Sequence, residues 1–546
     1  MTRTQQWGTR VGLVLAMAGN AVGLGNFLRF PAQAAQNGGG AFLIPYLISF
    51  ALMGIPLLWV EWAIGRHGGG FGHHSAPGQL DRLGPYRWLK YVGVFGLFTN
   101  LCVAAYYCYI ESWTLAYVWH SVAGTFRAVD PQRFFPDYLG VTAGSMFALP
   151  LPALFFFAVT LALNTFVLSR GLEKGVELAA KIGMPMLLVF ALVLAVRGLT
   201  LAPGDPGVIE SPLVGLNFVW QPRLSGLLNP TTWMAAAGQI FFTLSVGMGS
   251  IHCYASYVKQ KQDVALNAAS AGWMNEFVEV VLGGSILIPI ATAYLGLNVV
   301  QAATAGGSGF GIGFLTLPTL FNNWGWFAPL AGAMWFGLLF FAGITSSLAM
   351  GQPILSFLED EFGFRRTRAA LAFGAATFLL GFVCVWLYPG GAFDEFDFWT
   401  GTFALVVFAL LEVVIFAWIF GMDRGWEEIT RGADIAVPRI FRFVIKWVTP
   451  TFILVVFLGA LFQPQGRAWG AAFWKLFGGE MWPFAPESVI GRVLHVGDAG
   501  YSWLDAAGAP TRAMVQDLSR LLLLAVFALC FFLVWKAWRL KARREK

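Results

Sequence analysis

The sequence predicts an all-α polytopic membrane protein with about twelve transmembrane helices, arranged as two inverted five-helix repeats and two C-terminal helices. The composition excludes a soluble globule, since 57% of the 546 residues are hydrophobic, only 12% are charged, and the mean hydropathy is +0.66. Apolar runs of membrane-spanning length recur along the whole chain. The first and the sixth of these runs are interrupted by glycines near their centres.

Twelve apolar runs reach the length of about 20 residues that a helix needs to cross a bilayer. In order, they cover residues 10–36, 40–66, 88–122, 152–169, 175–197, 229–256, 263–294, 324–358, 368–388, 395–421, 438–463 and 512–538. We therefore divide the chain into an N-terminal tail (1–9), a first repeat (10–200), a second, inverted repeat (225–422), two additional transmembrane helices (437–538) and a basic tail (539–546).

The basic residues predict the orientation of the chain in the membrane. Lys and Arg are concentrated in the loops that would share one side with the N-terminus, and in the final segment WKAWRLKARREK. Because such loops stay in the cytoplasm, we expect both termini to be cytoplasmic and the protein to lie in the bacterial inner (cell) membrane. The net charge of +6 resides in these short loops, so it does not indicate nucleic-acid binding. The five cysteines all lie in apolar runs and indicate buried packing.

The first run contains a segment that a spanning helix should avoid, GNAVGLGNFLRF at 19–30. Its glycines weaken a helix, and its Asn and Arg side chains are costly at membrane depth without partners. We expect the helix to break there and to expose backbone carbonyls and amides. Residues 22–26 (VGLGN) have a counterpart at 246–250 (VGMGS), five runs later. Because five is odd, the second unit must run through the membrane upside down, which predicts a transport site near the bilayer midplane.

Seven motifs carry a resemblance to a known family. They are GNAVGLGNFLRFP, NGGGAFLIPY (37–46), YYCYIESWTL (106–115), GQIFFTLSVGMG (238–249), NEFVEVVLGG (275–284), FAGITSSLA (341–349) and DEFDFW (394–399). Together they resemble the neurotransmitter:sodium symporter family, and most closely its bacterial amino-acid transporters of the leucine transporter type, over residues 7–460. The resemblance implies a sodium-coupled symporter that imports neutral hydrophobic amino acids by alternating access without chloride.

The resemblance also implies two sodium sites. The first would use the Ala21 carbonyl and the side chains of Asn26, Thr243 and Asn275, together with the substrate carboxylate. The second would use the carbonyls of Gly19, Val22 and Ala342 and the hydroxyls of Thr345 and Ser346. All these ligands are neutral oxygens, as a sodium ion beside a carboxylate requires. Two alternatives stay open: the asparagines could only bond neighbouring helices, and the hydroxyls could only bond the preceding helical turn.

By the same resemblance, the substrate would lie between the two breaks. Its pocket would be formed by Asn20, Ala21, Gly23, Leu24, Gly25, Val103, Tyr107, Phe242, Thr243, Ser245, Met248, Ser346 and Met350. Position 23 is Gly where relatives that carry monoamines have Asp, so amines without a carboxylate are disfavoured. Methionine is unbranched and adaptable, and residues 248 and 350 are both Met, so we expect room for larger aliphatic or aromatic side chains. Ordinary core packing remains the alternative for Val103 and Met350.

Two gates would flank the pocket. The outer gate would be the pair Arg29 and Asp397, with Phe242 as a lid, and a purely structural ion pair is the alternative. The inner gate would use Tyr257 and Asp360.

Several carboxylates lie within the apolar runs. Glu279, beside Tyr46 and Gln239, would replace the chloride ion of chloride-dependent relatives. Glu61 and Glu412 would meet beside the breaks and accept hydrogen bonds from amides freed there. Two carboxylates so close cannot both ionise easily, so one should hold a proton, and we favour a structural role over proton coupling.

Four further residues receive no role in the transport site. Glu111 and Glu276 are left unassigned, and His73 and His74 lie in a predicted cytoplasmic loop, where we expect them to be solvated. The arginine that partners the inner-gate carboxylate in the family is displaced here to Arg3.

Other functional classes are weaker. The sequence has no phosphate-binding loop, no HExxH motif, and no Ser or Cys with a nearby His in the spans, so we expect no enzyme. A non-transporting amino-acid sensor or receptor on the same fold could keep every site residue, and it stays as the alternative function. The expected partners are a small-molecule amino acid, sodium ions and membrane lipid, with no nucleic acid, and a homodimer stays open.

Overall fold

The computed structural model describes residues 7–305, 309–498, 500–506 and 508–544, which form helices joined by short loops. Ten helical segments in these ranges are long and apolar enough to cross a membrane, and the shorter apolar helix α1 (Arg10–Ala21) precedes them. The two remaining expected spans, the first and the sixth, are present as interrupted helices. The expectation of about twelve spans with breaks in spans one and six is therefore confirmed.

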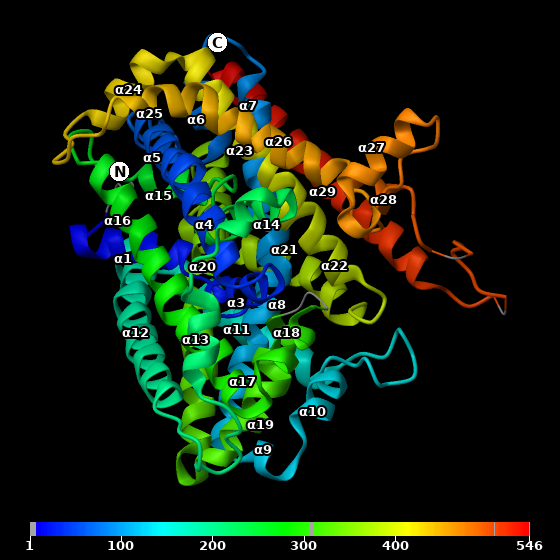
Figure 1. Cartoon of the computed structure of the whole chain (residues 1–546). Coiled ribbons are helices and arrows are strands. Elements are labelled where there is room, and N and C mark those ends of the chain that lie inside the picture. Colours follow the sequence, from blue (N-terminus) through cyan, green and yellow to red (C-terminus); the bar gives the residue numbers. More distant parts are fainter. Residues whose placement is uncertain (1–6, 306–308, 499, 507, 545–546) are drawn as a thin grey trace.

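The first five spans follow the expected order (Figure 1). Their elements are α1 with α2 (Leu24–Phe27) and α3 (Arg29–Gln36); α4 (Gly40–Ser49), η1 (Phe50–Gly54) and α5 (Ile55–Gly69); α7 (Leu89–Val92) and α8 (Val94–Val122); α11 (Leu151–Ser169); and η2 (Leu172–Glu177) with α12 (Leu178–Leu199). The loops between them carry α6 (Ala76–Asp81), α9 (Thr125–Ala128) and α10 (Pro131–Tyr138).

The next five spans repeat this pattern. Their elements are α14 (Pro230–Leu244) and α15 (Ser250–Ala255); α16 (Ala265–Glu276), η4 (Phe277–Leu282), η5 (Gly283–Ser285) and α17 (Leu287–Leu295); α20 (Ala328–Phe362); α21 (Arg366–Trp386); and α22 (Ala392–Phe396), η8 (Asp397–Phe403), α23 (Ala404–Val414) and η9 (Ile415–Gly421), continued by α24 (Met422–Thr430). Shorter helices fill the loops: α13 (Pro212–Trp220), η3 (Leu224–Leu228), α18 (Leu297–Ala305), η6 (Gly311–Thr316), α19 (Leu317–Phe321) and η7 (Asn322–Phe327).

The last two spans lie at the edge of the bundle. They are α25 (Ile440–Phe443), η10 (Val444–Val448) and α26 (Thr449–Leu461), and then α29 (Arg512–Arg544). Between them stand η11 (Gln465–Arg467), α27 (Trp469–Phe477) and α28 (Val489–Val493). In Figure 1, α29 runs to the top of the view, where the Trp538 indole nitrogen donates to the Asp81 carboxylate at 2.9 Å and Lys541 pairs with Glu361 at 2.8 Å.

Backbone conformation causes both interruptions. The first helix stops at Ala21 because Val22 and Gly23 adopt extended backbone angles. In the sixth span, Ser245, Gly247 and Gly249 have φ values of 53°, 74° and 86°, a left-handed region that glycine enters without steric cost. Glycine is therefore needed for the left-handed backbone at Gly247 and Gly249 in the sixth span, whereas the first break uses extended angles and Ser245 caps the end of α14.

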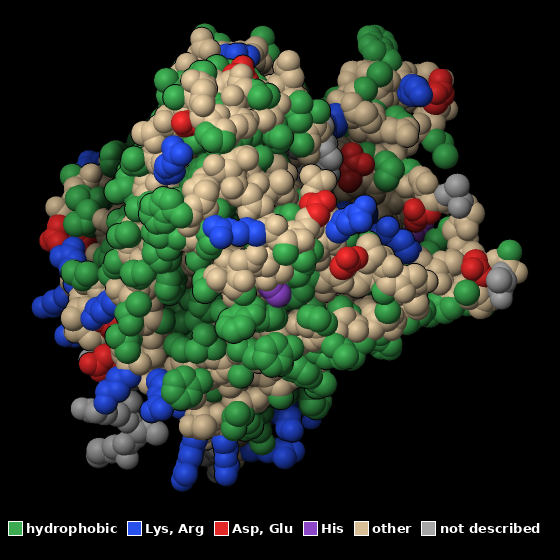
Figure 2. Space-filling model, turned by 90° about the horizontal axis from the view of Figure 1, so that it is seen from below, with side chains coloured by type: hydrophobic (Ala, Val, Ile, Leu, Met, Phe, Trp, Pro, Cys, Tyr) green, Lys and Arg blue, Asp and Glu red, His purple; other side chains and the backbone are tan. Residues whose placement is uncertain are grey.

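Helices α8 and α20 form the centre of the bundle, where they pack against each other along most of their length. Outer helices expose apolar side chains instead, as α12 does with Ile182, Val189, Leu192 and Val196. Figure 2 shows that hydrophobic side chains cover much of one face, while charged side chains stand singly or in small groups. A surface of this kind suits contact with lipid rather than water.

Candidate functional site

The two helix breaks face each other in the interior of the bundle. The Ser245 hydroxyl donates to the Asn20 backbone carbonyl at 3.0 Å, and the Ser250 hydroxyl donates to the Asn20 side-chain oxygen at 3.2 Å. Each helix end leaves up to about four backbone groups without a partner inside the helix. The breaks therefore concentrate free carbonyls and amides at one buried place.

A small cavity of about 20 Å³ lies between the breaks. Its walls are Ala21, Gly23, Gly25, Asn26, Val103, Tyr106, Tyr107, Phe242, Thr243, Ser245, Met248, Ser346, Met350, Gly401 and Leu405. All the predicted pocket residues line it except Asn20 and Leu24. No Asp or Glu contributes to this wall.

Three wall residues were not predicted for the pocket or for an ion site: Tyr106, Gly401 and Leu405. A β-carbon at Gly401 would lie only 2.2 Å from the Tyr106 hydroxyl oxygen, so glycine is required for the tenth span to approach α8. An isolated glycine in an apolar run, as at position 401, is the sequence feature that could have indicated this close approach.

One end of the cavity is polar. The Leu24 amide donates to the Tyr107 hydroxyl at 3.1 Å, and the Gly23 amide donates to the Asn26 side-chain oxygen at 2.8 Å. A β-carbon at Gly23 would lie 2.7 Å from the Tyr107 hydroxyl oxygen. Position 23 thus has no room for a larger side chain, in agreement with the absence of an acidic residue there.

The side chains predicted for the first sodium site are in contact. The Asn26 amide nitrogen donates to the Asn275 side-chain oxygen at 2.8 Å, and the Asn275 amide nitrogen donates to the Thr243 hydroxyl at 3.0 Å. Ala21 lies on the adjoining cavity wall. Asn26 and Asn275 join α2 to α16, so the interhelical hydrogen bond expected as the alternative is present in the same set.

The Glu279 carboxyl group lies buried beside that set. One carboxylate oxygen accepts from Gln239 at 2.7 Å, and the other accepts from Asn26 at 3.1 Å and from the Thr243 hydroxyl. Its side chain has no solvent exposure. Tyr46, the other residue predicted here, is also fully buried.

The oxygens predicted for the second sodium site converge on Ser346. Its hydroxyl lies 3.1 Å from the carbonyls of Gly19 and Ala342 and 3.5 Å from that of Val22. The Thr345 hydroxyl donates to the Ala342 carbonyl at 3.2 Å, which is the back-bonding expected as the alternative. The Ser346 hydroxyl also lies within hydrogen-bond distance of the Gly19 carbonyl in α1, so its contacts are not confined to its own helix.

The outer gate differs in detail from the expectation. The Arg29 guanidinium lies over the Phe242 ring, 4.4 Å from its centre, and Phe242 lines the cavity. Within the part of the chain that the structure describes, no ion pair joins Arg29 to Asp397. The Asp397 carboxylate instead lies beside Gly401 and the Tyr106 hydroxyl.

On the opposite side of the cavity, Tyr257 and Asp360 are connected through His74. The imidazole of His74 stacks on the Tyr257 ring with centres 4.2 Å apart, and the His74 amide donates to Asp360 at 2.9 Å. The expectation that His73 and His74 are solvated was wrong. His73 is buried beside Glu361, and burial, reinforced by the neighbouring His73, lowers the pKa of His74 to about 4. Arg3 lies outside the described residues.

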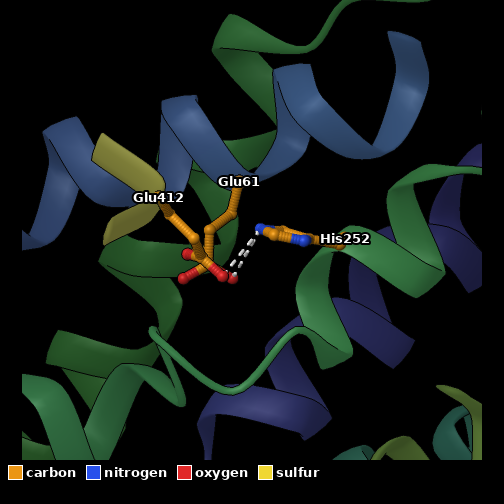
Figure 3. A group of neighbouring side chains, drawn as sticks. All are labelled: Glu61, His252 and Glu412. Atoms are coloured by element: carbon orange, nitrogen blue, oxygen red, sulfur yellow. Dashed lines mark ion pairs between the residues drawn. The ribbon is translucent and has the colours of Figure 1, made fainter. Parts of the chain in front are cut away.

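Glu61 and Glu412 do meet beside the break in the sixth span (Figure 3). As expected, Glu61 accepts a hydrogen bond from a freed amide, that of Gly247, at 2.6 Å, whereas Glu412 accepts none from the described residues. The imidazole of His252, which our sequence analysis did not single out, points at both carboxylates.

Comparisons with known proteins agree with this geometry. A sequence model of the sodium:neurotransmitter symporter family matches residues 4–128 and 153–489. The chain is 30% identical over 465 residues to an uncharacterized sodium-dependent transporter of Methanocaldococcus jannaschii, covering 84% of this chain and 90% of that one. It is 27% identical over 538 residues to sodium-dependent nutrient amino acid transporter 1 of Drosophila pseudoobscura pseudoobscura, covering 87% of this chain and 79% of that one. Its fold matches the crystal structure of MhsT in complex with L-phenylalanine with a TM-score of 0.71 and 29% identity, covering 83% of this chain and 99% of that chain.

Proposed function

The chain belongs to the sodium:neurotransmitter symporter family, and we propose that it imports neutral hydrophobic amino acids by sodium-coupled symport with alternating access. Family and fold are those of transporters rather than enzymes. The observation that carries the proposal is the cavity between the two breaks, which has a polar end, an otherwise mostly apolar wall and no acidic side chain.

The wall chemistry supports a zwitterionic substrate with an apolar side chain. The Leu24 amide and the Tyr107 hydroxyl stand at the polar end, where a carboxylate would bind. Val103, Met248 and Met350 stand along the apolar wall and can adapt to branched or aromatic groups. MhsT, with the same fold, was crystallised with L-phenylalanine, which favours aromatic and large aliphatic amino acids here as well.

Two sodium ions would drive the uptake. The oxygen set around Asn26 and Asn275 would hold one ion beside the substrate carboxylate, and the set around Ser346 would hold the other. Each ion that crosses 100 mV and a tenfold gradient releases about 3.7 kcal/mol, so two ions supply about 7 kcal/mol. This free energy would concentrate an amino acid by roughly five orders of magnitude.

Transport would not need chloride. The Glu279 carboxyl group lies within hydrogen-bond distance of Asn26 and Thr243, both members of the first sodium set, and in its ionised form it would supply a fixed negative charge there. A buried carboxylate there offsets the charge of the sodium ion, as a bound anion would do.

Alternating access would use the contacts on the two sides of the cavity. Phe242 and Arg29 would open on the outer side, and the cluster of Tyr257, His74 and Asp360 would open on the inner side. We place the inner side, both termini and the basic end of α29 in the cytoplasm of a bacterial cell because of the distribution of Lys and Arg.

The test is uptake of labelled amino acids by the purified full chain in proteoliposomes. An inward sodium gradient should drive accumulation of phenylalanine and leucine, and an equal potassium gradient should not. Tyr107→Phe should reduce the apparent affinity, because it removes the hydroxyl at the polar end, whereas Tyr109→Phe, a matched change outside the cavity wall, should not. Binding without accumulation would favour the amino-acid sensor, and accumulation without sodium would refute the coupling.

A further inference from the structure

Glu61, His252 and Glu412 form a completely buried cluster on three different helices, α5, α15 and α23 (Figure 3). None of the three side chains has any solvent exposure. One oxygen of Glu61, both oxygens of Glu412 and both ring nitrogens of His252 have no hydrogen-bond partner among the described residues. A buried polar atom without a partner costs about 1–3 kcal/mol, so the cluster in this form is incomplete.

The spacing of the three groups does not fit direct hydrogen bonds. The Nε2 atom of His252 lies 3.4 Å from a Glu412 oxygen and 3.8 Å from a Glu61 oxygen, and ligand atoms from all three residues lie within 4.8 Å of one another. A charge-assisted hydrogen bond between imidazole and carboxylate measures about 2.7–2.9 Å. Two ligands bound at about 2.0–2.2 Å to a tetrahedral zinc ion are about 3.3–3.6 Å apart, which is close to the observed spacing.

The donor set of the cluster can bind a cation. Two carboxyl groups share this apolar interior, and within the described residues His252 is the one basic side chain within 4 Å of either of them. A divalent cation would bind both carboxylates in their ionised form and would accept the lone pair of Nε2, so that no proton would be needed to neutralise the pair.

We propose that Glu61, His252 and Glu412 bind a divalent transition-metal ion, with Zn²⁺ as the best fit. Imidazole nitrogen and carboxylate oxygen are both zinc ligands, and a water molecule would complete the tetrahedron. Calcium and magnesium are disfavoured because they require six or more oxygen ligands.

Such an ion would fix the break in the sixth span. Glu61 already holds the Gly247 amide, and His252 lies in the short helix α15 that follows the break. The metal would therefore join α15 to α5 and α23 and keep the freed backbone in place. This inference does not rest on the proposed function, because it predicts a bound ion whether or not the protein transports.

The experiment is to measure the metal content of the full chain, purified in detergent without a polyhistidine tag and dialysed against metal-free buffer. Mass spectrometry should find about one zinc ion per chain in the wild type. His252→Leu and Glu412→Gln should each reduce the retained zinc by roughly tenfold or more, because each removes a ligand. The matched control His120→Leu, at a histidine of α8 distant from the cluster, should retain the wild-type content.

A second readout is the melting temperature with and without the chelator 1,10-phenanthroline. The chelator should lower the melting temperature of the wild type and of His120→Leu but leave that of Glu412→Gln unchanged. If wild-type protein binds no zinc, manganese, iron or cobalt even when these ions are added, the proposal is wrong, and protons must then satisfy the cluster. Equal zinc retention by the wild type and both cluster variants would overturn it as well.

Discussion

Replacing Glu279 with Ser should make sodium-dependent amino-acid binding require chloride. The change removes the carboxylate that accepts from Gln239, Asn26 and Thr243. Asn26 and Thr243 keep Asn275 as a partner, but the Gln239 amide is left without an acceptor, which costs about 1–3 kcal/mol. Loss of the negative charge beside the first sodium set adds to this cost, so we expect affinity to fall roughly 10- to 100-fold without chloride.

The assay is binding of labelled phenylalanine to purified protein in sodium gluconate, with chloride added back in steps. Chloride should restore most of the affinity of Glu279→Ser and should not change that of the wild type. The matched control is Glu111→Ser, which removes a buried carboxylate from α8 that bonds Asn164 outside the site. If Glu279→Ser binds equally well in gluconate and in chloride, Glu279 does not replace an anion.

Three further predictions follow from local geometry. In Gly25→Ala the new β-carbon would lie 2.5 Å from the Phe242 ring, which lines the cavity, so phenylalanine binding should weaken by about tenfold or more. The control Gly238→Ala, where a β-carbon meets open space, should bind phenylalanine normally. In Ser346→Ala the apparent sodium affinity should fall about tenfold, because a hydroxyl is lost from the second set, and Ser347→Ala, whose hydroxyl donates to the Ile344 carbonyl outside that set, should behave as wild type. Because the pKa of His74 is lowered from 6.5 to about 4, the unfolded state binds more protons between these values, and stability should fall by up to about 3 kcal/mol as the pH drops from 6.5 to 4. The melting temperature should show a smaller fall over that pH range in His74→Gln, and an unchanged pH profile would contradict this assignment.

The spans and the two breaks could be predicted from the sequence because they depend on local physics. Apolar runs of fixed length identify the helices, and glycines mark the points where the backbone must leave the helix. The family resemblance predicts one sodium site from side chains that are in contact in the structure. Asn26, Asn275 and Thr243 are far apart in the sequence, and their contact depends on how the helices pack.

Other features depend on packing that a single sequence does not reveal. His74 precedes a short helix and looks like an ordinary loop residue, yet it is held between Asp360 and Tyr257. His252 is one polar residue in an apolar segment, and its importance comes from the two glutamates that other helices carry to it. Arg29 was expected to reach Asp397 directly, but its guanidinium stacks on an aromatic ring, an interaction that competes well in a buried setting.

Coupling of the two fluxes is the most direct test of the proposed function. Proteoliposomes that contain the full chain and equal sodium on both sides would receive an inward gradient of phenylalanine, and entry of radioactive sodium would be followed. We expect the amino-acid gradient to drive net entry of sodium, which has no gradient of its own at the start, and we expect Ser346→Ala to need more sodium to show the effect. Sodium entry that is the same with and without phenylalanine would contradict symport.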